Sequence, residues 1–301
     1  MLKMYLTQAH AGNTPDFWEE NWGASLFEDA VKFCAVDPLR PLFDRYLRPD
    51  SLMLEGGCGA GNYVTYYSAR GYRVVGLDFA QRALKTLRTR QPAVTLCGGD
   101  VSRLPFADEI FDLYYSGGVV EHFEDGALKS LAEARRVLKH DGILLISVPY
   151  YSPLRRLLSP FRKREWRNVN ESAVDGKETI KDKKFFQYAY RTNEFEKILA
   201  DSGLTTIGRQ GYAVLWGLYE IPFFSQNDVE MSDRSVAKPR SETGEVSTSD
   251  LIKERPNSML KRLVVNEDDS IPVFGLGVKL MRWASANMMM YVCKKSGQNS
   301  V

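Results

Sequence analysis

A run of glycines at residues 55–61 (EGGCGAG) is the part of the sequence best suited to binding chemistry. It directly follows a short apolar segment, residues 51–55, and precedes a segment with helical character. Glycines permit positive φ and let a ligand approach the main chain with no Cβ in the way. Free N–H groups and the helix dipole at the start of a helix attract polar ligand groups. The pattern therefore predicts a turn that holds a small molecule.

The spacing of these glycines separates two kinds of cofactor. A dinucleotide turn, G-x-G-x-x-G, would need glycine at position 62 after Gly57 and Gly59, but Asn62 stands there and Gly61 comes one residue early. The acid before the turn, Glu55, would also lie unfavourably beside a pyrophosphate, whereas it suits a ligand with an ammonium group. An NAD(P)-dependent oxidoreductase is therefore the weaker alternative.

Strands and helices that alternate along the chain would position this turn. Apolar runs predict strands at 51–55, 73–78, 93–97, 112–116 and 143–148, and helical spacing predicts helices at 62–69, 80–89 and 126–138. A helix starting at 192, a strand at 204–207 and a late strand at 288–292 follow. This alternation predicts an α/β fold with a doubly wound, mostly parallel seven-stranded sheet.

The rest of the chain divides by composition. We expect an N-terminal helical lid over 1–48, the core over 49–150 and a basic and aromatic cap insertion over 151–190. The core ends with the helix and strand of 191–224, and residues 274–301 supply the strand region that completes the sheet. Residues 225–273 have no aromatic side chain and many polar ones, which predicts a flexible or disordered insertion before the last strand.

Several motifs, taken in order, resemble the class I, or Rossmann-like, S-adenosylmethionine-dependent methyltransferases of the small-molecule type 11 kind. The match covers roughly residues 50–150: residues 55–61 resemble the first motif, E/D-x-G-x-G-x-G, which wraps the methionine part of the cofactor. Asp78 resembles the acid that holds the ribose hydroxyls, and Asp100 the one that binds the adenine amino group. Residues 111–116 resemble the fourth strand, whose end opens on the transferred methyl. The resemblance implies S-adenosyl-L-methionine as cofactor, bound by Glu55, Gly56, Gly57, Gly59, Gly61, Asp78, Phe79, Asp100, Val101 and Ser116.

His122 is the candidate for acid–base chemistry, because it follows the fourth strand at the end near the methyl. A neutral imidazole there could take the proton of an acceptor hydroxyl, or His122 could simply orient the loop, with Glu121 and His122 opening the next helix. Methyl transfer from a sulfonium asks mainly for placement and desolvation, so a base need not exist. A non-catalytic protein that binds the cofactor for regulation stays open as an alternative.

The acceptor is predicted to be a small molecule methylated on oxygen, with a glycan- or lipid-linked acceptor as one possibility. The sequence lacks the D/N-P-P-Y/F and Pro-Cys motifs of nucleic-acid methyltransferases, and the net charge of +2 favours no nucleic-acid partner. Basic and aromatic residues interleave over 150–167, which suits a phosphate-bearing acceptor, an anionic membrane surface or a merely solvated cap.

Scattered cysteines and the absence of a signal-like leader predict a cytoplasmic protein with no metal site. The apolar stretch 271–293 contains Lys279 and Arg282 near its middle, so a membrane-spanning helix is not expected. Contact with a membrane would have to be peripheral.

Overall fold

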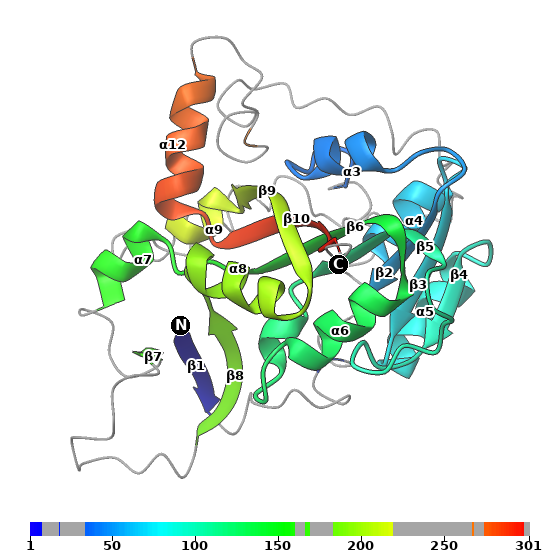
Figure 1. Ribbon diagram of the computed structural model, residues 1–301, viewed down its shortest axis with the longest axis horizontal. Helices are drawn as coiled ribbons and strands as arrows, with labels where there is room; N and C mark the ends of the chain where they lie inside the picture. Colours follow the sequence, from blue (N-terminus) through cyan, green and yellow to red (C-terminus); the bar gives the residue numbers. More distant parts are fainter. Residues whose placement is uncertain are drawn as a thin grey trace, which may run out of the picture.

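The chain is described from a computed structural model over residues 1–7, 18, 34–159, 166–168, 183–218, 267 and 274–297. Its centre is a seven-stranded sheet with the strand order β4-β3-β2-β5-β6-β10-β9 (Figure 1). The strands are β2 (Leu52–Gly56), β3 (Arg73–Asp78), β4 (Thr95–Gly98), β5 (Phe111–Gly117), β6 (Leu138–Pro149), β9 (Leu204–Tyr212) and β10 (Met288–Lys295). The predicted doubly wound α/β fold is confirmed.

The direction of the strands fixes where a ligand can bind. Strands β2 to β6 pair in parallel, whereas β10 runs antiparallel to both β6 and β9. From β2 the chain builds outward through β3 and β4, and then returns to build β5 and β6 on the other side. The order therefore reverses between β2 and β5, and ligands of such sheets bind outside the carboxyl ends of the strands at this point.

Helices cover both faces of the sheet, and each face has its own apolar core. On one face α3 (Arg40–Tyr46), α4 (Asn62–Ser68) and α5 (Gln81–Arg90) bury Phe43, Val64 and Leu84. On the other, α6 (Leu128–Val137) and α8 (Thr192–Asp201) bury Leu131 and Leu199. The helical periods seen in the sequence agree with these buried faces.

The N-terminal segment differs from the predicted helical lid. Residues 2–7 form β1 (Leu2–Thr7), the middle strand of a small antiparallel sheet between β7 (Trp166–Asn168) and β8 (Lys183–Ala189). Leu2 is buried in a small cluster with Tyr151 and Ala189, so tertiary pairing with the cap region decides the conformation of this end. Of residues 8–33 of the expected lid, only Trp18 lies within the described part of the chain.

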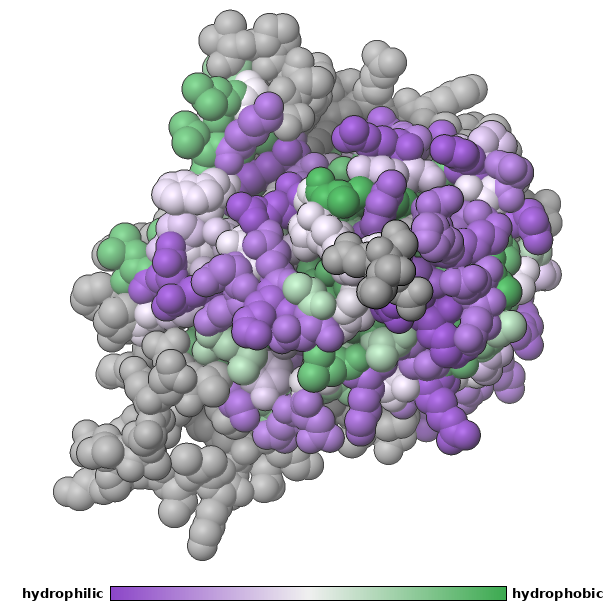
Figure 2. Space-filling view, in the orientation of Figure 1, coloured by the Kyte–Doolittle hydropathy of each residue, from purple (hydrophilic) through white to green (hydrophobic). Residues whose placement is uncertain are grey.

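The C-terminal region brings a helix before the last strand. Helix α12 (Gly275–Ser285) leads into β10 and packs against α7 (Pro153–Leu158) and α9 (Val214–Leu218). Hydrophobic side chains gather on the surface over α12 (Figure 2). The predicted flexible insertion at 225–273 falls outside the described residues except for Glu267. Among the described helices, none is long and apolar enough to cross a bilayer.

Candidate cofactor and acceptor site

The glycine turn lies at the switch point and has the backbone that only glycine adopts easily. Gly57, Gly59 and Gly61 have φ of 76°, 50° and 72°, in the left-handed region. A Cβ on Gly57 would meet Val119 Cγ2 at 2.4 Å, so glycine also permits close approach of the segment after β5. Gly57 N and Cys58 N both donate to the carbonyl of Leu77, at 2.7 and 3.0 Å, which fixes the turn to β3.

Asp78 closes β3 and is directed at the same turn. Its Oδ2 accepts a hydrogen bond from Gly59 N at 2.7 Å, and its Oδ1 accepts one from Ala80 N at 2.8 Å. The residue is buried, and a carboxylate oxygen can accept more than one hydrogen bond. The parallel pairing of β2 with β3 brings this carboxylate to the turn that the sequence indicated.

Glu55, at the end of β2, is the second buried carboxylate. Its Oε2 accepts a hydrogen bond from Val64 N at 2.8 Å, in the first turn of α4. Burial raises the pKa of this carboxyl to about 8, and the charge of Asp78 adds to the rise against the opposing hydrogen bond. A cation brought beside it would favour the ionised form, because opposite charge stabilises a carboxylate.

The remaining predicted cofactor-binding residues differ in how far they are exposed to solvent. Asp100 is exposed, and its Oδ1 accepts a hydrogen bond from Ser102 N at 2.8 Å, while the neighbouring Gly99 N donates to the carbonyl of Asp78 at 3.0 Å. Val101 is buried, whereas Phe79 is 36% exposed at the end of β3. Gly56 lies under the ring of Tyr114, since a Cβ there would meet that hydroxyl at 2.3 Å.

Ser116 lies near the end of β5, where the resemblance puts the transferred methyl. It is buried, and among the described residues its Oγ has no hydrogen-bond partner. Buried hydroxyls in proteins are nearly always hydrogen-bonded. An unsatisfied one at the switch point is consistent with a ligand that completes it.

His122 lies in a short 3₁₀ helix, η2 (Val120–His122), not at the start of the next α-helix. Its Nδ1 donates to the carbonyl of Phe186 in β8 at 2.8 Å, a role that requires the proton on Nδ1 and leaves the lone pair on Nε2. The ring also packs edge-on against Trp18 and Phe186. Burial lowers the pKa of His122 to about 4, so the imidazole is neutral near neutral pH.

Glu121, which the sequence places at a possible helix start, is more deeply buried than His122. It is 1% exposed, and within the described part of the chain its Oε2 has no hydrogen-bond partner. Burial raises the pKa of this carboxyl to about 8. Burial first, and then the nearby Glu121 carboxylate, raise the pKa of the Tyr190 hydroxyl. The only feature of the sequence that pointed to Glu121 was its position as an acid directly after the fourth strand.

Asp37, which precedes α3 and was not among the predicted site residues, contacts the site through Tyr63. Tyr63 on α4 donates its hydroxyl to Asp37 Oδ2 at 2.7 Å, and its ring lies edge-on to Tyr115 of β5 at 4.7 Å. Burial raises the pKa of Asp37. Three acids, Asp37, Glu55 and Glu121, thus lie around the end of β5 together with tyrosine rings, a lining that suits a polar or cationic group.

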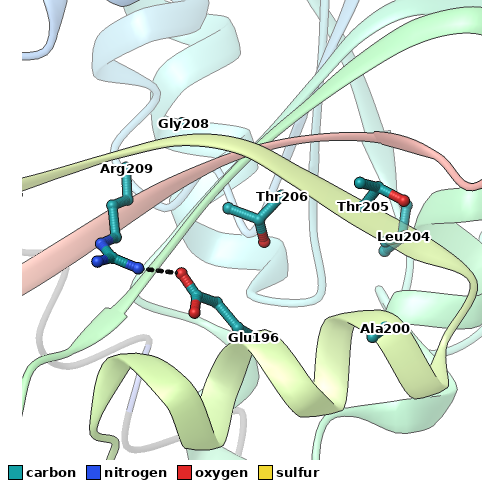
Figure 3. A pocket seen from close by; sticks show the side chains of 7 residues that line it. All are labelled: Glu196, Ala200, Leu204, Thr205, Thr206, Gly208 and Arg209. Atoms are coloured by element: carbon teal, nitrogen blue, oxygen red, sulfur yellow. Dashed lines mark hydrogen bonds and ion pairs between the residues drawn. The ribbon is translucent and has the colours of Figure 1, made fainter.

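One hollow on the described surface lies away from the glycine turn. It has a volume of about 470 Å³ and lies between α8 and the edge strand β9 (Figure 3). Arg209 and Glu196 point toward one another across it and form an ion pair. It contains no glycine turn and no buried acid, so we assign it no part in cofactor binding.

Comparison with known proteins identifies the region around the turn. Residues 54–146 match the family model of a methyltransferase domain. Over 117 residues the chain is 35% identical to a probable S-adenosylmethionine-dependent methyltransferase of Mycolicibacterium smegmatis, a match that covers 38% of this chain and 45% of the relative. Over 109 residues it is 34% identical to the malonyl-[acyl-carrier protein] O-methyltransferase of Serratia marcescens, covering 36% and 42%.

A solved structure gives the same fold over nearly the whole chain. A chain in the complex of the Haloferax volcanii Trm112 methyltransferase activator with a methyltransferase aligns with a TM-score of 0.53, covering 98% of this chain and 100% of that one at 14% identity. By contrast, the chain spans less than half the length of the two curated relatives above. Residues 54–146 therefore constitute a class I S-adenosylmethionine-dependent methyltransferase domain.

Proposed function

We propose that this protein transfers a methyl group from S-adenosyl-L-methionine to an oxygen atom of a small-molecule acceptor. The observation that carries the proposal is the pair of buried carboxylates, Glu55 and Asp78, at the carboxyl ends of adjacent strands around a glycine turn. Both accept hydrogen bonds from backbone N–H groups, those of Gly59 and Ala80 for Asp78 and that of Val64 for Glu55. A ligand with an ammonium group and a pair of hydroxyls suits this arrangement.

The residues of the site divide among the parts of that cofactor. Glu55 would accept the ammonium of the methionine part, Asp78 the ribose hydroxyls and Asp100 the adenine amino group, with Phe79 and Val101 beside the ring. The left-handed glycines leave the turn without side chains where the cofactor would lie against it. When bound, S-adenosylmethionine supplies a methyl group that its sulfonium already activates, so the chain has to bind, orient and exclude water.

Two groups compete to take the proton of the acceptor hydroxyl. His122 Nε2 has the required lone pair, but its pKa of about 4 makes it a weak base. Glu121 has an oxygen without a partner among the described residues and a pKa of about 8, close to a working pH. We therefore assign the proton acceptor to Glu121, and we assign His122 the role of fixing η2 against β8 through Phe186.

An anionic acceptor is supported by a second, smaller hollow at the end of β6. It has a volume of about 210 Å³ and is lined by Tyr150, Tyr151, Arg156, Arg191, Thr192 and Asn193. The guanidinium of Arg191 lies 5.7 Å from the centre of the Tyr151 ring. Two arginines in a polar hollow suit a phosphate or carboxylate. This supports a phosphate-bearing acceptor, including a lipid-linked one reached from a peripheral position on a membrane.

Calorimetry followed by a transfer assay tests the proposal. We expect S-adenosylhomocysteine to bind, and radiolabel from S-adenosylmethionine to reach a hydroxyl-bearing acceptor in a screen of phosphorylated and lipid-linked compounds. Glu121→Gln should lower kcat by about 10²–10⁴-fold with unchanged affinity for S-adenosylhomocysteine, the loss typical of a general base. His122→Asn is the matched variant; a greater loss in it than in Glu121→Gln would return the role to His122.

The assay also has outcomes that contradict the proposal. Binding of S-adenosylhomocysteine without transfer to any acceptor would favour a regulatory protein. No binding of S-adenosylhomocysteine together with binding of NADH would favour an oxidoreductase. Transfer to a nitrogen atom with a normal rate in Glu121→Gln would remove both the oxygen acceptor and the proton acceptor.

A further inference from the structure

Helix α12 exposes apolar side chains and buries an arginine, which is the reverse of an ordinary surface helix. Leu276, Leu280 and Trp283 are 71%, 57% and 61% exposed, and their spacing puts them on one outward face. The inward face instead buries Arg282, together with Val278 and Ser285. A surface helix of a globular protein normally buries its apolar stripe and exposes its charges.

The buried arginine is satisfied inside the protein. Arg282 Nε lies 3.1 Å from Glu267 Oε2, and its Nη2 donates to the carbonyl of Glu267 at 2.7 Å. The other oxygen of Glu267, Oε1, accepts a hydrogen bond from Val214 N at the start of α9. These contacts hold α12 in the orientation that exposes its leucines and tryptophan, so the outward stripe is built into the fold.

The apolar surface continues onto two neighbouring helices. Trp216 of α9 is 62% exposed and Leu157 of α7 is 68% exposed, while Phe274 stands half exposed just before α12. We call these six exposed side chains the α12 platform: Leu157, Trp216, Phe274, Leu276, Leu280 and Trp283. In Figure 2 hydrophobic side chains cover α12, and a smaller group covers α7.

The helices under the platform are tightly joined. The backbone of α9 touches that of α12, since a Cβ on Gly217 would lie 1.5 Å from the carbonyl oxygen of Ser285. The buried Arg155 of α7 donates to the carbonyl of Tyr150 at 2.7 Å and to the side chain of Asn287, which directly precedes β10. A partner would therefore meet a preformed surface.

The charged residues of the three helices that carry the platform are all basic. The 6, 5 and 11 residues of α7, α9 and α12 include Arg155, Arg156, Lys279 and Arg282 but no aspartate or glutamate. Arg155 and Arg282 are buried, whereas Arg156 and Lys279 are exposed beside the apolar side chains. Exposed Leu, Phe and Trp next to Lys and Arg is the composition of helices that lie in a membrane interface.

We propose that the α12 platform docks this protein on an anionic lipid surface. Tryptophan is favoured at the boundary of headgroups and acyl chains, and two of the six platform residues are tryptophans. A second copy of the chain is a poorer occupant, because a symmetric contact through this face brings exposed Arg156 and Lys279 of both copies together with no acid from these helices. The lipid headgroups supply the negative charge that the platform lacks.

The α12 platform lies toward the same edge of the sheet as the glycine turn. Helix α7 follows the carboxyl end of β6, and α12 precedes the start of the antiparallel β10, so both lie toward the edge of the sheet that holds the glycine turn. The hollow with Arg156 and Arg191 adjoins α7. A docked protein would thus present its acceptor side to the lipid, which agrees with the lipid-linked acceptor proposed above but does not depend on methyl transfer.

Co-sedimentation with vesicles tests the platform without any assay of activity. We expect the protein to sediment with vesicles of phosphatidylcholine and phosphatidylglycerol in about a 7:3 ratio, and to be released from them by salt. Leu280→Gln and Trp283→Gln should each weaken binding by about tenfold or more, since each removes a large side chain from the lipid boundary. Lys279→Gln should weaken it about fivefold, and only at low salt.

Leu128→Gln is the matched control, because Leu128 is 54% exposed on α6, away from the platform. It should leave vesicle binding unchanged, and circular dichroism should show the same fold for all variants. The proposal is overturned if the wild type does not bind the vesicles, or if Leu280→Gln and Trp283→Gln bind as well as the wild type. A concentration-dependent dimer that the same two variants dissociate would identify a second copy as the occupant and overturn it too.

Discussion

The glycine turn and helix α12 both bury acidic side chains, but the groups that surround these acids differ. At the turn, Glu55 and Asp78 are buried against backbone N–H groups, and the charge of Asp78 helps to raise the pKa of Glu55. Under α12, the buried Glu267 faces the guanidinium of Arg282. At the turn a cationic ligand would favour the ionised form of Glu55, whereas under α12 the carboxylate of Glu267 is already paired with a guanidinium.

This difference determines which side chains of each region contact a ligand or a binding partner. At the turn the buried groups themselves are the binding surface, so ligand affinity should depend on their ionisation. At α12 the buried pair only sets the orientation of the helix, and the exposed apolar side chains are left for contact. Changes to the buried acids should therefore alter ligand affinity, whereas changes under α12 should alter folding stability.

The largest effect is expected from breaking the pair under α12. In Arg282→Met the carboxylate of Glu267 stays buried without its cation, which should lower the free energy of unfolding by about 3–5 kcal/mol. Burial already raises the pKa of Glu267, so the protonated acid limits the loss at low pH. The destabilisation, measured by urea unfolding, should be larger at about pH 8 than at about pH 5.

The double variant Glu267→Gln with Arg282→Met is the control for that prediction. It removes both charges and should recover part of the lost stability, because no unpaired charge is left buried. If Arg282→Met alone were as stable as the wild type, the guanidinium would not be what holds α12 in its inverted orientation.

A smaller effect, on binding rather than folding, is expected from Asp78→Asn. Loss of a charged acceptor should weaken affinity for S-adenosylhomocysteine by one to two orders of magnitude, or about 1.5–3 kcal/mol, in a calorimetric titration. Asp112→Asn is matched, because Asp112 Oδ2 accepts a hydrogen bond from Leu52 N at 2.9 Å at the opposite edge of the sheet. Equal affinity in Asp78→Asn and Asp112→Asn would refute the assignment of Asp78.

The pH dependence of ligand affinity should report the ionisation of the Glu55 carboxyl. Its pKa of about 8 means that the carboxyl is largely protonated near pH 7, so an ammonium ligand must displace a proton. Affinity should rise by up to tenfold per pH unit below about pH 8, and binding near neutral pH should release about one proton. Calorimetry in buffers of different ionisation enthalpy measures that proton. Glu55→Gln should release none, whereas Glu121→Gln should release as many as the wild type.

The same raised pKa has the opposite consequence for folding. The folded state holds the proton of Glu55 at pH values where the unfolded chain has lost it. Its contribution to stability is therefore complete below the ordinary pKa of glutamate and is lost as the pH rises through about 8. Without ligand, the wild type should lose stability over this range more steeply than Glu55→Gln does.

The sequence predicted the sheet and the turn because both depend on local patterns. Buried parallel strands need continuous apolar runs, such as 143–148, and left-handed turns need glycine, so these features leave a direct signature. β6 begins five residues before the run that predicted it, and β9 extends to Tyr212, because strand pairing continues past the apolar residues. The exact ends of these strands therefore depend on their pairing with neighbouring strands and not on their own apolar residues.

The features that the sequence did not predict depend on segments far apart in the chain. β1 is a strand because β8 pairs with it, although the two are separated by more than half of the sequence. The burial of Glu121 and the inverted face of α12 likewise follow from packing. Lys279 and Arg282 excluded a spanning helix in the sequence, yet only the contact of Arg282 with Glu267 shows which side of α12 is exposed.

The smallest effect is expected from the ion pair between Arg209 and Glu196 in the surface hollow. Arg209 and Glu196 are 52% and 29% exposed, so water screens their attraction and hydrates either partner when the other is lost. Arg209→Met should therefore change the free energy of unfolding by about 0–1 kcal/mol, and equally at low and neutral pH. Urea unfolding beside Arg282→Met measures the contrast directly. A loss as large as that of Arg282→Met would mean that burial is not what separates the two ion pairs.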